Sequence, residues 1–337
     1  MSKARELAEL GAVYDSGALS NRNKIINGAF QVWQRGTSQT GSNSYGSVDR
    51  WVLYTSGNGL TAAQSNDVPS GSGLTYSIAT TGTSSGEYIL AQGIELTKTG
   101  YAGEFYNGQK ITISYYAKSS VAGDKLRHFI AFRNTTTGST NQSIIENNTN
   151  QNDLTTSYQR FSKTYTISVD PNSTNTVLCV MIRTRNAAND SSTAAGNITI
   201  AGVQLEVGSE ATPFEHRSFG QELALCQRYY HRIEGTSKLV GHCFYYGTTE
   251  VDVEVNLPRT MRAAPSLTAS SGSNYFRIQH YADDFNTFSG VQYYSGASLN
   301  MWAQSGGSIG TISGTAGDAG YVVTNSASSV LEFSSEL

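Results

Sequence analysis

Charged side chains are scarce in this chain of 337 residues. Asp, Glu, Lys and Arg make up 15% of the sequence, and 23 basic residues against 26 acidic ones give a formal net charge of −3. Proteins that bind nucleic acid through its phosphates present a concentrated basic surface. The composition does not provide such a basic surface, and we therefore expect no nucleic-acid partner.

Long apolar runs and cysteines are also few. No stretch of 18 apolar residues occurs, so the sequence predicts no membrane insertion. The N-terminus lacks the hydrophobic segment and cleavage site of a signal peptide, so we expect synthesis in the cytoplasm without signal-peptide export. Cys179, Cys226 and Cys243 are odd in number and widely spaced, so they form neither a disulfide framework nor a metal cluster. We expect them to be small buried hydrophobic residues.

Alternating apolar residues dominate what remains. Hydrophobic residues make up 38% of the chain, whereas Pro occurs only 5 times. Between residues 111 and 117, for example, Ile111 and Ile113 alternate with Thr112 and Ser114, which is typical of a strand with one apolar face. This patterning predicts an all-β protein rather than a disordered one.

About nine such runs, separated by turn residues, predict a jelly-roll β-sandwich over residues 24–216. The candidate strands are residues 30–34, 51–54, 74–79, 88–94, 110–118, 126–132, 159–169, 177–183 and 198–207. In the last of them the apolar register slips between Ile200 and Val203. One extra residue in a strand is the mark of a β-bulge, and Gly202 is the residue that can accommodate it.

The periodicity then changes from two residues to nearly four. Leu223, Cys226 and Tyr230 recur at helical spacing, and Ser218 with Gln221 fits a capping box. These features predict a linking helix over residues 217–233. Beyond it, residues 238–246 and 250–257 predict a β-hairpin, and residues 251–257 alternate again. Further candidate strands at 275–281, 290–294, 299–303 and 321–333 complete the prediction of a second, smaller β-sandwich over residues 234–337.

Several segments resemble those of bacteriophage tail fibre proteins. Residues 203–230, with QLE, ATPFE and LALCQRYY, are similar to the domain junction of these fibres. Residues 27–36 (NGAFQVWQRG) and 49–51 (DRW) resemble the opening of their jelly-roll domain, and residues 261–265 (MRAAP) resemble the start of their C-terminal domain. The resemblance covers residues 24 to 265 in order.

This resemblance implies a place in the virion tail and a homotrimeric assembly. Residues 1–23 would then be the attachment arm that binds other phage tail proteins, and the C-terminal sandwich would be the tip that contacts the host. In a trimer, the stripe of Leu223, Cys226 and Tyr230 is a candidate for packing near the three-fold axis.

Candidate catalytic and metal-binding patterns are weak. Residues 306–310 (GGSIG) match a nucleophile elbow but lack the flanking strand and helix. Asp283 and Asp284 are neighbours, which in a strand point to opposite faces and make a poor catalytic pair. We therefore expect no enzyme, no cofactor and no metal. The histidines never approach metal-ligand spacing, and we expect surface or cap residues at His128, His216, His231, His242 and His280.

The Tyr-rich C-terminal region carries the best functional signal. Sugars stack their apolar C–H faces on aromatic rings, and their hydroxyls pair with Asn, Gln, Ser and Asp. The candidate glycan-binding residues are Trp302, Tyr293, Tyr294, Tyr281 and Asp284. About half of such rings are expected to be core residues of the small sandwich instead.

The leading hypothesis is therefore a tail fibre protein that attaches a phage to host surface polysaccharide or lipopolysaccharide. One alternative is a tailspike-like polysaccharide depolymerase, which would require paired carboxylates and usually a parallel β-helix. Another is a purely structural tail or baseplate component.

Overall fold

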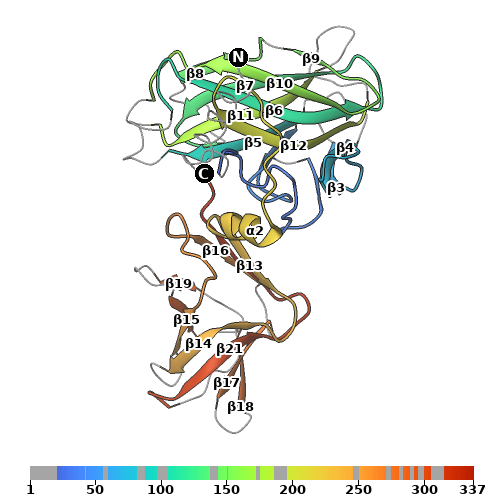
Figure 1. Ribbon diagram of the computed structural model, residues 1–337. Helices are drawn as coiled ribbons and strands as arrows, with labels where there is room; N and C mark the ends of the chain where they lie inside the picture. The colour runs from blue at the N-terminus through green and yellow to red at the C-terminus, as the bar shows by residue number, and fades with distance from the viewer. Residues whose placement is uncertain are drawn as a thin grey trace, which may run out of the picture. The chain divides into compact units, whose positions relative to one another are not determined.

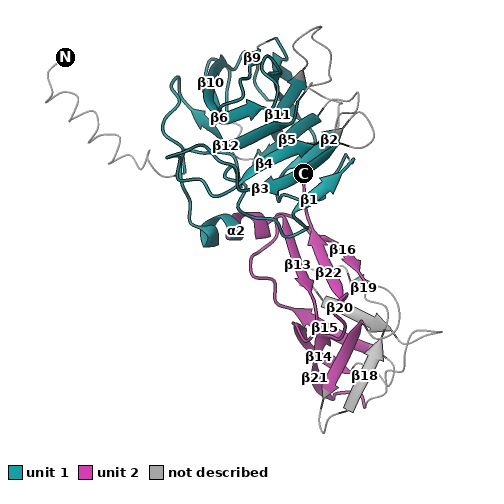
Figure 2. Cartoon of the chain, turned by 90° about the vertical axis from the view of Figure 1, so that its right-hand side faces the viewer, with its two compact units in different colours: residues 1–223, 337 teal, residues 224–336 magenta. Residues whose placement is uncertain are grey.

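The computed structural model describes residues 21–41, 43–55, 60–81, 88–96, 105–136, 143–149, 151–171, 175–185, 196–245, 250–270, 275–280, 284–288, 292–294, 300–304 and 315–337. The chain divides into two compact units (Figure 2). Unit 1 is Met1–Leu223 together with Leu337, and unit 2 is Ala224–Glu336. The prediction of an all-β protein with two sandwiches and a short helix between them is confirmed.

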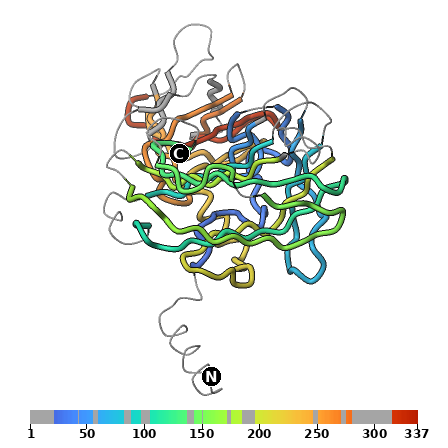
Figure 3. The backbone as a smooth tube through the Cα atoms, turned by 90° about the horizontal axis from the view of Figure 1, so that it is seen from above, coloured from blue at the N-terminus to red at the C-terminus, as the bar shows by residue number. Residues whose placement is uncertain are grey.

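Unit 1 consists of two sheets with antiparallel strand pairing. In Figure 3 the long strands of both sheets are aligned along nearly the same direction. Sheet 1 has the order β1 (Ser38–Thr40), β3 (Thr61–Ser65), β4 (Ser77–Thr81), β12 (Ile198–Val207), β6 (Lys110–Ser119) and β10 (Gln159–Thr166). Sheet 2 has the order β2 (Val52–Thr55), β5 (Tyr88–Glu95), β11 (Val177–Arg185), β7 (Lys125–Arg133) and β8 (Ser143–Asn147), with β9 (Asn152–Asp153) also paired to β7.

The alternation in the sequence decides which faces of these sheets meet. Ile111 and Ile113 of β6 are fully buried in one cluster with Leu178 and Val180 of β11, so the core lies between sheets 1 and 2. The predicted bulge is confirmed, because the pairing of β12 with β6 shifts register between Ala201 and Gln204 and Gly202 has a φ of 58°. A left-handed φ suits glycine best.

Residues 27–34 do not form the predicted strand at 30–34. The Asn27 side chain accepts hydrogen bonds from the backbone N–H groups of Gln31 (2.8 Å) and Val32 (3.0 Å), and it donates one to the carbonyl of Val32 (2.8 Å). Phe30 takes a φ of 53°. A side chain that satisfies the local backbone competes with a strand ladder, so the motif folds as a compact turn.

That turn is fixed to β12 and to the junction segment of unit 1. Gly28 lies against β12, where its carbonyl accepts the N–H of Val203 at 2.9 Å. The buried Glu222 carboxylate accepts the N–H of Asn27 at 2.5 Å and pairs with Arg217 at 3.3 Å. Residues 27–36 and residues 203–223, the part of segment 203–230 that belongs to unit 1, therefore meet in space.

The single helix among the described residues, α2 (Phe219–Gln227), is shorter than predicted (Figure 1). Its capping box is confirmed, because the backbone N–H of Gln221 donates to the Ser218 hydroxyl at 3.3 Å and the backbone N–H of Ser218 donates to the side-chain oxygen Oε1 of Gln221 at 3.0 Å. Instead of continuing to residue 233, the chain enters strand β13 (Tyr230–Glu234). Tyr230 is therefore not on the helix, and the predicted stripe of Leu223, Cys226 and Tyr230 does not form.

Two further sheets form unit 2. Sheet 3 has the order β13, β22 (Val330–Ser334) and β16 (Ser266–Ala269). Sheet 4 has the order β18 (Asp284–Phe288), β17 (Phe276–His280), β21 (Ala319–Thr324), β14 (Leu239–Tyr245), β15 (Glu250–Val255), β20 (Asn300–Gln304) and β19 (Gln292–Tyr294). The predicted strand 321–333 is thus two strands in different sheets. Cys243, Val253, Leu331 and Phe333 share one core cluster, so sheets 3 and 4 enclose a common core.

Candidate functional site

The described residues contain no group of three or more His, Cys, Asp or Glu side chains that could hold a metal ion. Among them, no helix is long and apolar enough to cross a membrane. The three cysteines are free and buried, as expected. Of the predicted attachment arm, residues 21–23 are described and residues 1–20 lie outside the described part of the chain.

His128 is neither a surface nor a cap residue, which corrects the prediction for it. It is fully buried between Tyr115 and Tyr165, whose hydroxyls lie 2.8 Å from Nε2 and 2.9 Å from Nδ1. Burial, and to a lesser extent the charge of Lys163, lowers the pKa of His128 to about 3. The imidazole is therefore neutral and serves the core of unit 1.

The outer face of sheet 4 is where aromatic and polar residues gather. Along β15, Val251 and Val253 are buried in the core of unit 2, whereas Asp252 and Glu254 point away from it. Along β14, Cys243 is likewise buried and Phe244 is 49% exposed. Period-two alternation on neighbouring strands thus gives sheet 4 one core face and one outer face.

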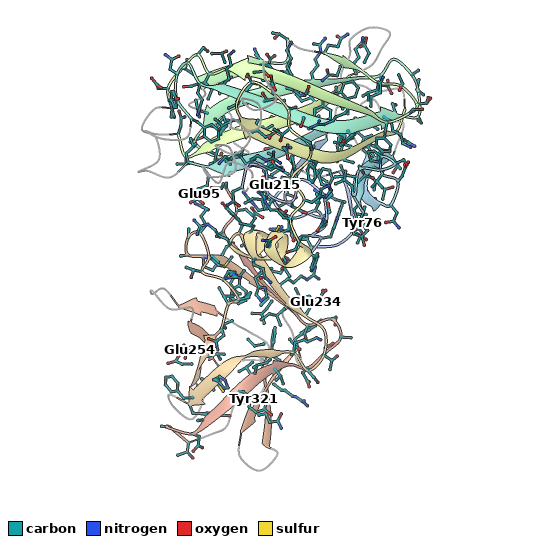
Figure 4. All side chains as sticks on the ribbon, in the orientation of Figure 1. Tyr76, Glu95, Glu215, Glu234, Glu254 and Tyr321 are labelled. Atoms are coloured by element: carbon teal, nitrogen blue, oxygen red, sulfur yellow. The ribbon has the colours of Figure 1, made fainter. Side chains whose placement is uncertain are left out.

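The register shows which residues share this outer face. Phe244 is paired with Asp252, and the exposed His242 is paired with Glu254. His242 is also paired with Tyr321 of β21, which is 36% exposed. Directly opposed residues of antiparallel strands lie about 5 Å apart on the same side of the sheet. Figure 4 labels Glu254 and Tyr321 on their strands.

The same register places two of the predicted residues at positions of this outer face. Trp302 is opposite Asp252 on one side and Gln292 on the other. Tyr294 is opposite Asn300, which is opposite Glu254. The five paired positions from Gln292 through Trp302, Asp252 and Phe244 to Ala319 span roughly 19 Å across the strands.

We call these paired positions on the outer face of sheet 4 the aromatic row. The other predicted residues do not lie in it. Tyr293 is opposite Met301, which is opposite the buried Val253, so its position belongs to the core face. Asp284 is in β18, at the opposite edge of sheet 4 from β19, and it is paired with His280. Tyr281 lies outside the described residues.

Sequence analysis missed Phe244, His242 and Tyr321 as members of the site. Each lies in a strand of sheet 4, and none is among the predicted glycan-binding residues. The predicted hairpin of 238–246 and 250–257 is confirmed by the pairing of β14 with β15, but the pairing of β14 with β21 is a long-range property.

The predicted packing residues of the junction have different environments. Leu223 is partly buried, and Cys226 is fully buried. Tyr230 is buried in β13, and its hydroxyl donates a hydrogen bond to Glu332 at 2.8 Å. Their role at a three-fold axis stays a prediction.

No protein-family model and no curated protein sequence matches the chain. Solved structures similar to it include carbohydrate-binding modules. A CBM4 module aligns with 16% identity over 55% of this chain and 99% of its own length, with a TM-score of 0.33. The CBM22-1 xylan-binding domain from Paenibacillus barcinonensis Xyn10C aligns with 12% identity over 52% of this chain and 94% of its own length, with a TM-score of 0.32.

A protein from Bacteroides thetaiotaomicron that is described as sugar-binding aligns with 12% identity over 55% of this chain and all of its own length, with a TM-score of 0.37. All three TM-scores are below 0.5. These neighbours therefore carry no argument about what this chain binds, and the functional argument rests on its own residues.

Proposed function

We propose that this chain is a non-enzymatic tail fibre protein that attaches a bacteriophage to polysaccharide or lipopolysaccharide of its host through the outer face of sheet 4. The tail-fibre assignment is supported by the motifs in residues 27–36, 49–51, 203–230 and 261–265. The observation that carries glycan binding is the row in which Phe244 is paired with Asp252, and Asp252 with Trp302.

The residue types in this row suit sugars. An exposed aromatic ring such as Phe244 offers an apolar surface to the C–H face of a sugar. A carboxylate beside it, such as that of Asp252, can accept hydrogen bonds from hydroxyl groups. Apolar surface with a few placed polar groups is the usual make-up of a small-ligand site.

A homotrimer in the virion tail would make such contacts effective. One shallow site binds a sugar weakly, but linked sites raise the overall affinity through effective concentration. Residues 1–23 would attach this trimer to other tail proteins, and unit 2 would contact the host.

The test compares two exposed phenylalanines of the full chain. Phe244→Ser is expected to reduce binding of the purified protein to host cells by roughly 10-fold or more, because an aromatic anchor is lost from the site. Phe219→Ser is the matched control, since Phe219 is 56% exposed and belongs to unit 1. Binding is measured by titrating fluorescently labelled protein onto cells.

Equal binding by the wild type and Phe244→Ser would contradict the assignment to sheet 4. Release of new reducing ends from host polysaccharide would instead identify a depolymerase. A tight complex with another tail protein, without any binding to cells or their polysaccharide, would favour a structural tail component.

A further inference from the structure

The charged residues on the outer face of sheet 4 are mostly acidic. Three acidic residues, Glu250, Asp252 and Glu254, occupy outer-face positions, and the one basic residue in the seven strands is Arg277. The fourth acidic residue of these strands, Asp284, pairs with His280 at a core-face position. The first three lie on β15, next to β14 and β20. The aromatic row is therefore built around a strand of carboxylates.

Two basic residues of unit 2 have positions that can be compared with this row. Arg277 is in β17, and β21 and β14 separate it from β15, which puts about 14 Å between the strands. Lys238 precedes β14 and lies four residues from His242, again about 14 Å along an extended chain. Both separations exceed the Debye length of about 8 Å at physiological ionic strength. The positive charges of Arg277 and Lys238 therefore do little to neutralise the negative charge of the β15 carboxylates for a ligand bound at the row.

The two carboxylates of β15 also have a one-sided hydrogen-bonding capacity. Ionised Asp252 and Glu254 side chains only accept hydrogen bonds, whereas sugar hydroxyls and amines can donate them. A carboxylate or sulfate on an acidic sugar is itself an acceptor and an anion. Placed beside Asp252 and Glu254, it would meet like charge, and such a juxtaposition suppresses binding.

We infer that the outer face of sheet 4 selects glycans without acidic groups, namely neutral or amine-bearing sugars, and rejects uronic-acid and sulfated glycans. This inference rests on the proposed glycan-binding function. Within it, the aromatic positions supply affinity for any sugar, and the carboxylates of β15 supply the discrimination between sugar classes. Discrimination of this kind comes from an element that repels the wrong ligand.

The experiment uses the full-length protein on a glycan array. The array carries neutral hexose and N-acetylhexosamine oligosaccharides, glucosamine oligosaccharides, oligogalacturonates and sulfated oligosaccharides. We expect the bound glycans to be neutral or amine-bearing, with acidic analogues of the same length bound at least 10-fold more weakly at low salt. Stronger binding to the acidic set would overturn this inference and leave the proposed function in place. Absence of binding to the array and to host polysaccharide would overturn the proposed function itself.

A double variant tests the named carboxylates. Asp252→Asn with Glu254→Gln keeps the size of both side chains and removes two negative charges, and it is expected to reduce the discrimination against acidic glycans at least 10-fold. The control, Asp153→Asn with Glu234→Gln, removes the same charge from two exposed side chains, one in β9 of unit 1 and one in β13 of sheet 3. The control should discriminate like the wild type. If the double variant discriminates against acidic glycans as strongly as the wild type, then Asp252 and Glu254 do not cause the selectivity, and the inference is contradicted.

Discussion

Replacing Gly28 with alanine is expected to destabilise unit 1 by about 3 kcal/mol or more. A Cβ atom at this position would lie 2.1 Å from the carbonyl oxygen of Val203, which is backbone and cannot rotate away. Relief requires residues 27–30 to move off β12, and that movement breaks the 2.9 Å hydrogen bond from Val203 N–H to Gly28. Urea unfolding followed by tryptophan fluorescence measures the loss, since Trp51 is fully buried in this region.

Gly220→Ala is the matched control for this substitution. Gly220 lies in α2, and nothing is within 4 Å of its added Cβ. Alanine stabilises a helical position relative to glycine by about 0.5–1 kcal/mol, so this variant should be as stable as the wild type or slightly more stable. An unchanged urea midpoint for Gly28→Ala would show that the turn does not fix the first motif to β12.

Acid is expected to destabilise unit 1 through His128. The pKa of His128 is lowered to about 3 in the folded protein and is about 6.5 when unfolded, so between these values the unfolded chain binds one more proton. Stability contributed by the neutral imidazole is therefore full above pH 6.5 and is lost as the pH falls toward 3. From pH 7 to pH 5 the loss is about 2 kcal/mol.

The His128→Gln variant isolates this contribution. Glutamine can still donate to one tyrosine hydroxyl and accept from the other, but it has no proton to take up in this range. The free energy of unfolding of unit 1, measured by urea titration at pH 7, 6 and 5, should fall less steeply for the variant. Parallel pH profiles for the two proteins would show that His128 is not the group that couples folding to protons.

Local sequence patterns predicted most elements of the fold. The alternation around Ile113, the register slip at Gly202 and the Ser218 capping box all depend on neighbours within a few residues, and each is present in the structure. The strand predicted at 30–34 is absent because the Asn27 side chain binds that backbone. The helix was overextended because Tyr230 pairs with Ser334, more than one hundred residues away.

The candidate site shows the same limit more clearly. Aromatic composition identified the correct half of the chain and the position of Trp302, but not its neighbours. Phe244 and Asp252 join Trp302 through pairing across β14, β15 and β20, and Asp284 is taken to the opposite edge by β18. Strand order and register come from the packing of the whole sheet, which a local pattern does not contain.

Hydroxyl-radical footprinting of the full-length protein with and without host surface polysaccharide tests the proposed binding face most directly. We expect bound polysaccharide to lower the oxidation rates of Phe244 and Tyr321, which lie on the outer face of sheet 4. Tyr106 and Phe219, which are 47% and 56% exposed on unit 1, should keep their rates. Protection of Tyr106 or Phe219, with Phe244 and Tyr321 oxidised as fast as in the free protein, would contradict the proposed binding face.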